Sequence, residues 1–225
     1  MIKKYRFFYD IISLVGFMLK EQKVIEYYKL CNKLKDVVRT GWLDWKVNRK
    51  RVESIAEHIY GTQMLAIAMN SEYEYDIDIT KVIYMLAIHE LGEIIIGDLT
   101  EFQISKEDKK REEHEAVHKI LSPLLDSKEI EDLFLEFDEH LTNEAKFAYQ
   151  CDKLECDIQC KLYDQEGCVD LNNQEGNNTV DNETVKELLD KEKTWSDMWI
   201  EYDQEKCNYD ENFLLVSKYI KDNSI

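Results

Sequence analysis

The sequence is poor in the residues that make turns. Of its 225 residues only seven are glycine and one is proline, whereas 44% are hydrophobic. A chain of this length can bury one sizeable core, and its shortage of turn residues favours long helices. We therefore predict an all-α fold.

Basic residues are also scarce. Lys and Arg number 29 against 47 Asp and Glu, which gives a formal net charge of -18. Proteins that bind nucleic-acid polymers concentrate cations to displace counterions, so this surface would repel a phosphate chain. The charge balance argues against a nucleic-acid polymer as partner, but it allows a small phosphorylated ligand held by a local basic cluster.

The six cysteines lack CxxC spacing and lie at positions 31, 151, 156, 160, 168 and 207. This pattern predicts reduced thiols in a cytosolic protein rather than a disulfide framework. Cys156 and Cys160 share a helical face without a matching His or Cys pair elsewhere. We expect them to pack in the core rather than to form a zinc site.

A long membrane-spanning run is missing as well. Basic residues precede the apolar segment from Phe7 to Leu19, as they do in a signal peptide. Asp10 interrupts that segment, however, and no small-residue cleavage site follows it. The segment is too short to cross a bilayer, so we predict an amphipathic helix and no membrane association.

The longest apolar stretch, Lys81 to Thr100, contains several ionisable side chains. His89 and Glu93 share one helical face with apolar residues, and Glu90 lies a short rotation away. A buried carboxylate needs a cation or several hydrogen bonds, and a bound metal would meet that need. We interpret the stretch as one helix that ends near Asp98, whose carboxylate points toward the same site.

A second histidine lies at the start of another predicted helix. Ser54 and Glu57 have the spacing of a capping box, which predicts a helix from Ile55 to about Asn70. His58 falls in its first turns, where the helix macrodipole favours the neutral imidazole that binds metals.

An aspartate lies against the apolar stripe of a third predicted helix, from Glu144 to Tyr163. Asp152 in this position should have a partner, whereas Asp157 lies roughly on the other side and is predicted to be solvated. The periodicity predicts further helices at 24–38, 106–121, 128–139, 183–202 and 212–220.

The segment from Arg39 to Arg51 reverses the acidic average of the chain and carries two tryptophans, Trp42 and Trp45. Guanidinium groups beside aromatic rings suit a base or a sugar and its phosphate. The alternative is a solvated loop whose tryptophans anchor it to the core.

Several motifs follow one another along the chain: RTGW at 39–42, ESIAEH with His58, LAIHELGEIIIGDLT with His89 and Glu90, EAKF at 144–147 and QCDKLE with Asp152. In this order the chain, from about Tyr28 to Tyr163, resembles the HD-domain metal-dependent phosphohydrolases. The resemblance is to the 5′-deoxynucleotidase-like branch, which acts on nucleoside 5′-monophosphates. One departure is Glu90, because the family's second motif is normally His-Asp; glutamate adds one methylene to a metal ligand.

The resemblance implies an all-α, HD-domain helical bundle in which four side chains bind one divalent ion. Two imidazoles and two carboxylates suit Mn, Co, Fe or Zn better than Mg or Ca. Such an ion would acidify a bound water and polarise a phosphoryl oxygen. The implied ligands are His58, His89, Glu90 and Asp152.

The resemblance also implies roles for residues around the ion. Glu93 would orient or deprotonate the attacking water, and Asp98 would assist proton transfer to the leaving 5′-oxygen. Arg39 would hold the phosphate and Trp42 would pack against the sugar. Arg51 is either a second phosphate contact or a support for its loop.

We divide the chain into an N-terminal helical extension (1–22), an HD-domain core (23–165), and a loop with C-terminal helices packed on the core (166–225). The family resemblance implies a homodimer. The apolar segment from Phe213 to Ile220 would contribute to its interface, although docking on its own core is the competing explanation. A small nucleotide substrate and a cytoplasmic location complete the expectation.

Other activities share some of these features. A zinc peptidase with a His-Glu pair needs a histidine where Glu93 stands. A non-catalytic HD-like protein that only binds nucleotides, and an HD-like hydrolase of another nucleotide phosphate ester, remain alternatives. Glu93 and Asp98 favour an enzyme, and the lack of further His motifs argues against a dinuclear phosphodiesterase.

Overall fold

The computed structural model describes residues 18–100 and 103–225, and these ranges are helical apart from loops and one isolated bridge between Val38 and Ser54. The predicted all-α class is confirmed. Most of the predicted N-terminal extension lies outside the described residues. None of the described helices is long and apolar enough to cross a membrane.

The α-helices are α2 (Lys20–Cys31), α3 (Thr40–Asp44), α4 (Ile55–Tyr73), α5 (Ile79–Ile88), α6 (Glu93–Ile96), α7 (Lys106–Leu121), α8 (Ser127–Glu139), α9 (Asn143–Gln165), α10 (Glu183–Lys191), α11 (Trp195–Lys206) and α12 (Glu211–Asp222). Two 3-10 turns are η2 (Asn32–Lys35) and η3 (Asn178–Asp181).

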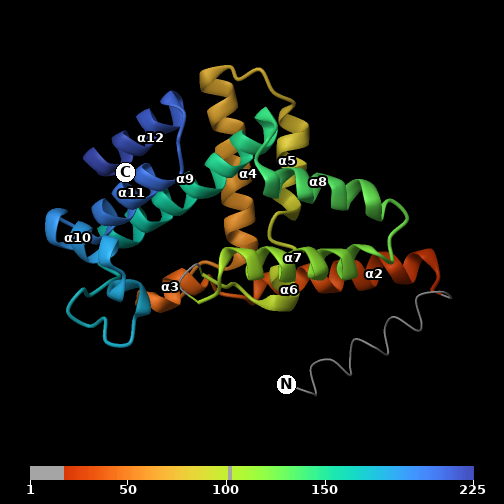
Figure 1. Cartoon of the computed structure of the whole chain (residues 1–225), viewed down its shortest axis with the longest axis horizontal. Helices are drawn as coiled ribbons and strands as arrows, with labels where there is room; N and C mark the ends of the chain where they lie inside the picture. The colour runs from red at the N-terminus through yellow and green to blue at the C-terminus, as the bar shows by residue number, and fades with distance from the viewer. Residues whose placement is uncertain (1–17, 101–102) are drawn as a thin grey trace.

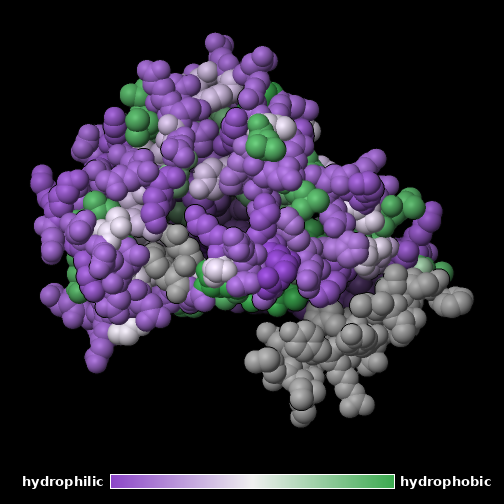
Figure 2. Space-filling view, viewed as in Figure 1, coloured by the Kyte–Doolittle hydropathy of each residue, from purple (hydrophilic) through white to green (hydrophobic). Residues whose placement is uncertain are grey.

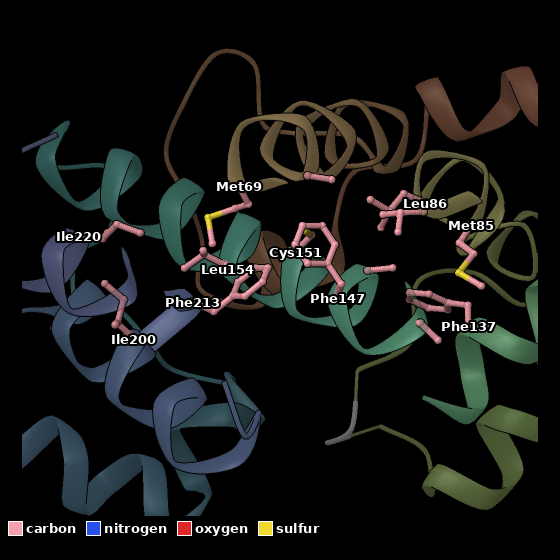
Figure 3. Close-up of a cluster of buried hydrophobic side chains, with 14 residues drawn as sticks. Met69, Met85, Leu86, Phe137, Phe147, Cys151, Leu154, Ile200, Phe213 and Ile220 are labelled. Carbon is pink, nitrogen blue, oxygen red and sulfur yellow. The ribbon is translucent and has the colours of Figure 1, made fainter. Parts of the chain in front are cut away.

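Helix α9 is the central element of the bundle (Figure 1). Helices α4 and α5 pack against it on one side, and α11 and α12 pack on the other. A helix buried on most of its surface needs apolar residues on several faces rather than one stripe. Figure 3 shows side chains of α9 meeting those of its neighbours, including Phe147, Cys151 and Leu154 from α9 with Met69, Leu86 and Phe213 around them.

Several predicted helix boundaries are confirmed. Ser54 and Glu57 form the predicted capping box, in which each side chain accepts a hydrogen bond from the other residue's backbone N–H. Helix α4 starts directly after Ser54, and α7 spans the predicted residues 106–121. These boundaries follow from local signals, because the cap and the apolar period lie within the helix itself.

The prediction of one continuous helix from Lys81 to near Asp98 is wrong. Helix α5 ends at Ile88, and hydrogen bonds from Leu91 N to Ile88 O (3.0 Å) and Glu93 N to Glu90 O (3.2 Å) close a tighter turn. Helix α7 crosses closely here: a Cβ at Gly92 would lie 3.1 Å from side-chain atoms of Glu113. The turn thus lets the chain bend beneath α7 and resume as the single turn of α6.

Two other predicted helices are also divided. The 24–38 helix ends at Cys31 and continues only as the 3-10 turn η2. The 183–202 helix is broken before α11, because the Thr194 hydroxyl accepts a hydrogen bond from Asp197 N (3.1 Å) and caps a new N-terminus. Capping competes with continuation of the helix, and periodicity alone does not reveal which one prevails.

The prediction that Asp157 is solvated is wrong. Its side chain is fully buried because α11 and α12 cover the second face of α9. The Tyr209 hydroxyl donates to Asp157 Oδ2 at 3.0 Å, and Oδ1 has no hydrogen-bond partner among the described residues. Burial and the neighbouring Asp203 carboxylate raise the pKa of Asp157 well above its usual range.

The segment from Arg39 to Arg51 contains the short helix α3, and its two tryptophans lie in a separate core that we call the tryptophan cluster: Trp42, Trp45, Tyr163 and Trp195. Trp42 and Trp45 are 2% and 1% exposed, so both anchor the segment to the bundle. This anchoring fixes the position of Arg39, which immediately precedes α3.

Candidate metal and phosphoester site

Four of the predicted site residues meet in space. His58 comes from the first turn of α4, His89 and Glu90 from the turn after α5, and Asp152 from the middle of α9. Their ligand atoms all lie within 4.8 Å of one another. His58 Nε2 is 3.0 Å from Asp152 Oδ1, and His89 Nε2 is 3.6 Å from Glu90 Oε1. The cluster is therefore compact enough for one ion to be bound by all four side chains.

Both imidazole rings are held with Nε2 directed into this cluster. His58 Nδ1 donates to Glu155 Oε2 at 2.6 Å, and His89 Nδ1 donates to the Leu86 carbonyl at 2.8 Å. These bonds place a proton on Nδ1 of each ring, so Nε2 is the nitrogen through which each ring would bind a metal. His89 Nε2 is buried and makes no hydrogen bond within the described residues. This unpaired atom and the donor set fit a divalent transition ion.

Glu155 is a site residue that the sequence analysis missed. It lies three residues after Asp152 on α9, and residues three apart on a helix are neighbours, so this spacing could have indicated that Glu155 lies near the ligand cluster. Gly61 on α4 provides its space, because a Cβ there would overlap the Glu155 carboxylate. The glycine in the interior of α4 is therefore explained by the carboxylate that orients His58.

Cations surround the ligand carboxylates. Arg39 Nη1 donates to Glu90 Oε1 at 2.8 Å, and Lys153 Nζ lies 2.9 Å from Asp152 Oδ2. Burial alone would raise the pKa of Glu90, but the electrostatic interactions of its carboxylate with the His89 side chain and the Arg39 guanidinium outweigh burial and lower the pKa to about 2. Both carboxylates are thus held in the ionised form that binds metals.

Glu93 and Asp98 lie beside the ligands. Glu93 is 3% exposed, and its Oε2 has no hydrogen-bond partner in the described residues, while Lys109 Nζ is 3.6 Å from Oε1. Burial, with the carboxylates of Glu90 and Asp98, raises the pKa of Glu93 well above its usual range. Asp98 Oδ2 accepts a hydrogen bond from Thr40 N at 2.6 Å, which ties the loop after α6 to the start of α3.

The ligand cluster opens onto a cavity of about 600 Å³ that Arg39, Glu93 and Asp98 also line. Figure 2 shows a mainly hydrophilic molecular face with a recess near its middle. A cavity of this size accommodates a small molecule. Its wall carries cations in a protein whose overall charge is strongly negative. These are, besides Arg39, the side chains of Lys106, Lys109, Lys110, Lys153 and Lys206.

The two remaining predicted substrate contacts are placed differently. Trp42 lines the cavity but is almost fully buried, and its indole N–H donates to Glu53 Oε2 at 2.7 Å. The Arg51 side chain is 81% exposed, pairs with Glu57 and does not line the cavity. Its position favours the second of its two predicted roles, a support for the loop.

Comparison with known proteins agrees with this geometry. The family model for the HD domain matches residues 31–195. A 5′-deoxynucleotidase HDDC2 from Dictyostelium discoideum is 35% identical over 150 residues, which are 63% of this chain and 78% of that protein.

Solved structures show the same fold. The PH0347 protein from Pyrococcus horikoshii superposes with a TM-score of 0.65 at 23% identity, over 88% of this chain and 98% of that one. A predicted metal-dependent phosphohydrolase from Magnetospirillum magnetotacticum MS-1 is 26% identical with a TM-score of 0.52, over 62% of this chain and 69% of that one. The motifs, the converging ligands and the family match over most of the chain all lead to one conclusion: the chain belongs to the HD domain family.

Proposed function

We propose that this chain is a metal-dependent phosphomonoester hydrolase that removes the 5′-phosphate from (deoxy)nucleoside 5′-monophosphates. The observation that carries the proposal is a buried His/Glu/Asp cluster on the wall of a cavity that Arg39 and five lysines also line. A dianionic phosphate suits this local charge, although the protein as a whole is acidic. The name of the Dictyostelium relative supports the choice of substrate.

In this proposal His58, His89, Glu90 and Asp152 hold one divalent transition ion, which would polarise a phosphoryl oxygen and acidify water. The longer side chain of Glu90 reaches both the imidazoles and Arg39 with the same oxygen. Mn, Co, Fe and Zn all match this donor set.

The residues of the chain would divide the remaining steps. Arg39 offers a planar pair of N–H groups to the phosphate oxygens. Glu93 accepts a proton from the attacking water, and its raised pKa makes it a stronger base than an ordinary glutamate. As the bond between phosphorus and the 5′-oxygen breaks, Asp98 assists proton delivery to that oxygen, while Trp42 supports the sugar side of the cavity.

The test is release of inorganic phosphate from a panel of nucleotides, with each of the four metals added in turn to metal-free protein. We expect release from nucleoside 5′-monophosphates and none from 3′-monophosphates. Elemental analysis should find one metal per chain, with loss in His58→Ala and Asp152→Ala. Turnover of triphosphates or cyclic dinucleotides alone would assign the site to another phosphate ester. Nucleotide binding without turnover under any metal would identify a non-catalytic binding protein.

We also propose a homodimer and a cytoplasmic location. Helix α12 docks on its own bundle through Phe213 and Ile220, but Leu215 and Tyr219 remain 55% and 62% exposed and could meet a second copy. Light scattering at micromolar concentration should return the dimer mass, and a monomer mass would reject it. All six cysteines are free thiols, which suits a reducing compartment.

A further inference from the structure

One wall of the cavity takes no part in the proposed reaction. It is formed by α11, which starts at Trp195, where the match to the HD domain family ends. Trp199, Tyr202 and Lys206 line the cavity from this helix, and their spacing of three and four residues places them on one face. The cavity thus continues from the phosphate end to a wall with aromatic character.

Trp199 differs from the chain's other three tryptophans. Trp42, Trp45 and Trp195 are at most 2% exposed, whereas Trp199 is only half-buried. Its ring packs against that of Trp42 in a tilted arrangement, with centroids 5.1 Å apart and an angle of 30° between the planes. A Cβ on Gly41 would lie 3.5 Å from Trp199 Cη2, so the backbone of α3 also supports the ring. Trp199 is therefore held in place by its neighbours, and its side chain is partly exposed where it lines the cavity.

We propose that Trp199 is the platform on which the nucleobase of the substrate stacks, which makes the α11 wall a base subsite. The inference rests on the proposed function, because it assumes a phosphate held at the Arg39 end of the same cavity. A nucleobase gains about 1 to 3 kcal/mol by stacking on an aromatic side chain, and each base offers a π-face. The subsite should therefore require a base without distinguishing strongly between bases.

Packing against the tryptophan cluster is the competing explanation for the position of Trp199. Trp195 provides a matched control, since it lies one turn earlier on α11 and contacts the same Trp42 ring, at 6.2 Å between centroids. Trp195 does not line the cavity. A purely structural effect should appear at both positions, whereas a stacking effect should appear only at Trp199.

The experiment compares kcat/KM for 2′-deoxyadenosine 5′-monophosphate with that for 2-deoxyribose 5-phosphate, which lacks the base. Trp199→Leu keeps an apolar side chain but removes the flat π-surface, and it should lower the ratio of the two values about 5- to 150-fold, the equivalent of about 1 to 3 kcal/mol. Trp199→Phe keeps a ring and should retain most of the ratio. Trp195→Phe should leave the ratio unchanged even if it lowers the melting temperature.

A ratio that Trp199→Leu does not alter, or that Trp195→Phe lowers equally, would overturn the base subsite. If the wild-type enzyme hydrolyses neither compound, the proposed function fails by itself. Calorimetric titration of the metal-loaded protein with 2′-deoxyadenosine 5′-monophosphate then decides the inference separately. Binding weakened by Trp199→Leu and kept by Trp195→Phe supports it, and equal binding by both variants or no binding by the wild type rejects it.

Discussion

Replacement of Glu155 should weaken metal binding although this residue is not one of the four ligands. Its carboxylate accepts the Nδ1 proton of His58 at 2.6 Å in a buried environment. That bond fixes the ring and the tautomer that directs Nε2 at the ion. Glu155→Gln keeps an acceptor oxygen without the charge, whereas Glu155→Ala leaves the Nδ1–H unpaired.

The size of the effect follows from this contact. Loss of a partner that orients a metal-binding histidine typically lowers metal affinity about 10- to 100-fold, which corresponds to about 1.4 to 2.8 kcal/mol of binding free energy. An unpaired buried donor adds about 1 to 3 kcal/mol of destabilisation in the alanine variant. We therefore expect Glu155→Ala to be affected more than Glu155→Gln. Gly61→Ala should reproduce part of the loss, because its Cβ displaces the same carboxylate.

The assay is calorimetric titration of metal-free protein with Mn²⁺ and Co²⁺, after thermal melts have confirmed folding. Glu72→Gln is the matched control. Glu72 is an exposed glutamate at the far end of α4 from His58, so this substitution removes the same charge away from the ligand cluster. Wild-type affinity in both Glu155→Ala and Gly61→Ala would refute the reasoning. It would mean that the protein holds His58 in place without its carboxylate partner.

Three further predictions concern catalysis and stability. Glu93→Ala should keep its metal by elemental analysis but lose about 10²-fold or more in kcat, and near wild-type kcat would make the residue structural. Arg39→Ala should mainly raise KM, because its contact is shared by ground and transition states; an equal fall in kcat at constant KM would contradict this. The pKa of Asp157 is higher in the folded protein than in the unfolded chain, so protonation of this carboxyl group stabilises the fold at low pH. That stability is lost as the pH rises from the usual carboxyl pKa through the pKa of the folded state. Asp157→Asn should therefore gain in melting temperature relative to wild type as pH rises above the usual carboxyl pKa, and a difference that stays constant with pH would reject a buried, titrating Asp157.

Much of the helical content could be predicted because its signals are local. Helix α7 spans its predicted residues, since its cap and apolar period lie within the segment. The turn at 89–92 could not be predicted in the same way. It depends on the close approach of α7 to Gly92, a contact between segments that are distant in sequence. Periodicity describes which residues share a face but does not reveal what crosses that face.

The ligand set could be proposed from sequence because each member lies on or beside an apolar face and follows a family motif. Their meeting within 4.8 Å is a structural result. The burial of Glu155 and of Asp157 was not predicted from the sequence, and the reason is the same for both. Helix α9 is covered on both sides, and its polar residues are buried with partners from other helices. A sequence pattern that assigns polar residues to solvent fails where such partners exist.

Helix α9 therefore connects the ligand cluster with the C-terminal helices, which the sequence suggests are separate parts of the molecule. It carries the ligand Asp152, and one turn later Glu155 orients the histidine of α4. Its opposite face buries Asp157 beneath α11 and α12. Helix α11 also forms a wall of the cavity. The packing of α11 on one face of α9 therefore positions residues that would contact a substrate bound near the opposite face of α9. The segment after residue 165 is thus part of the scaffold around the site, and changes in its packing against α9 should affect the ligand cluster because α9 carries Asp152 and Glu155.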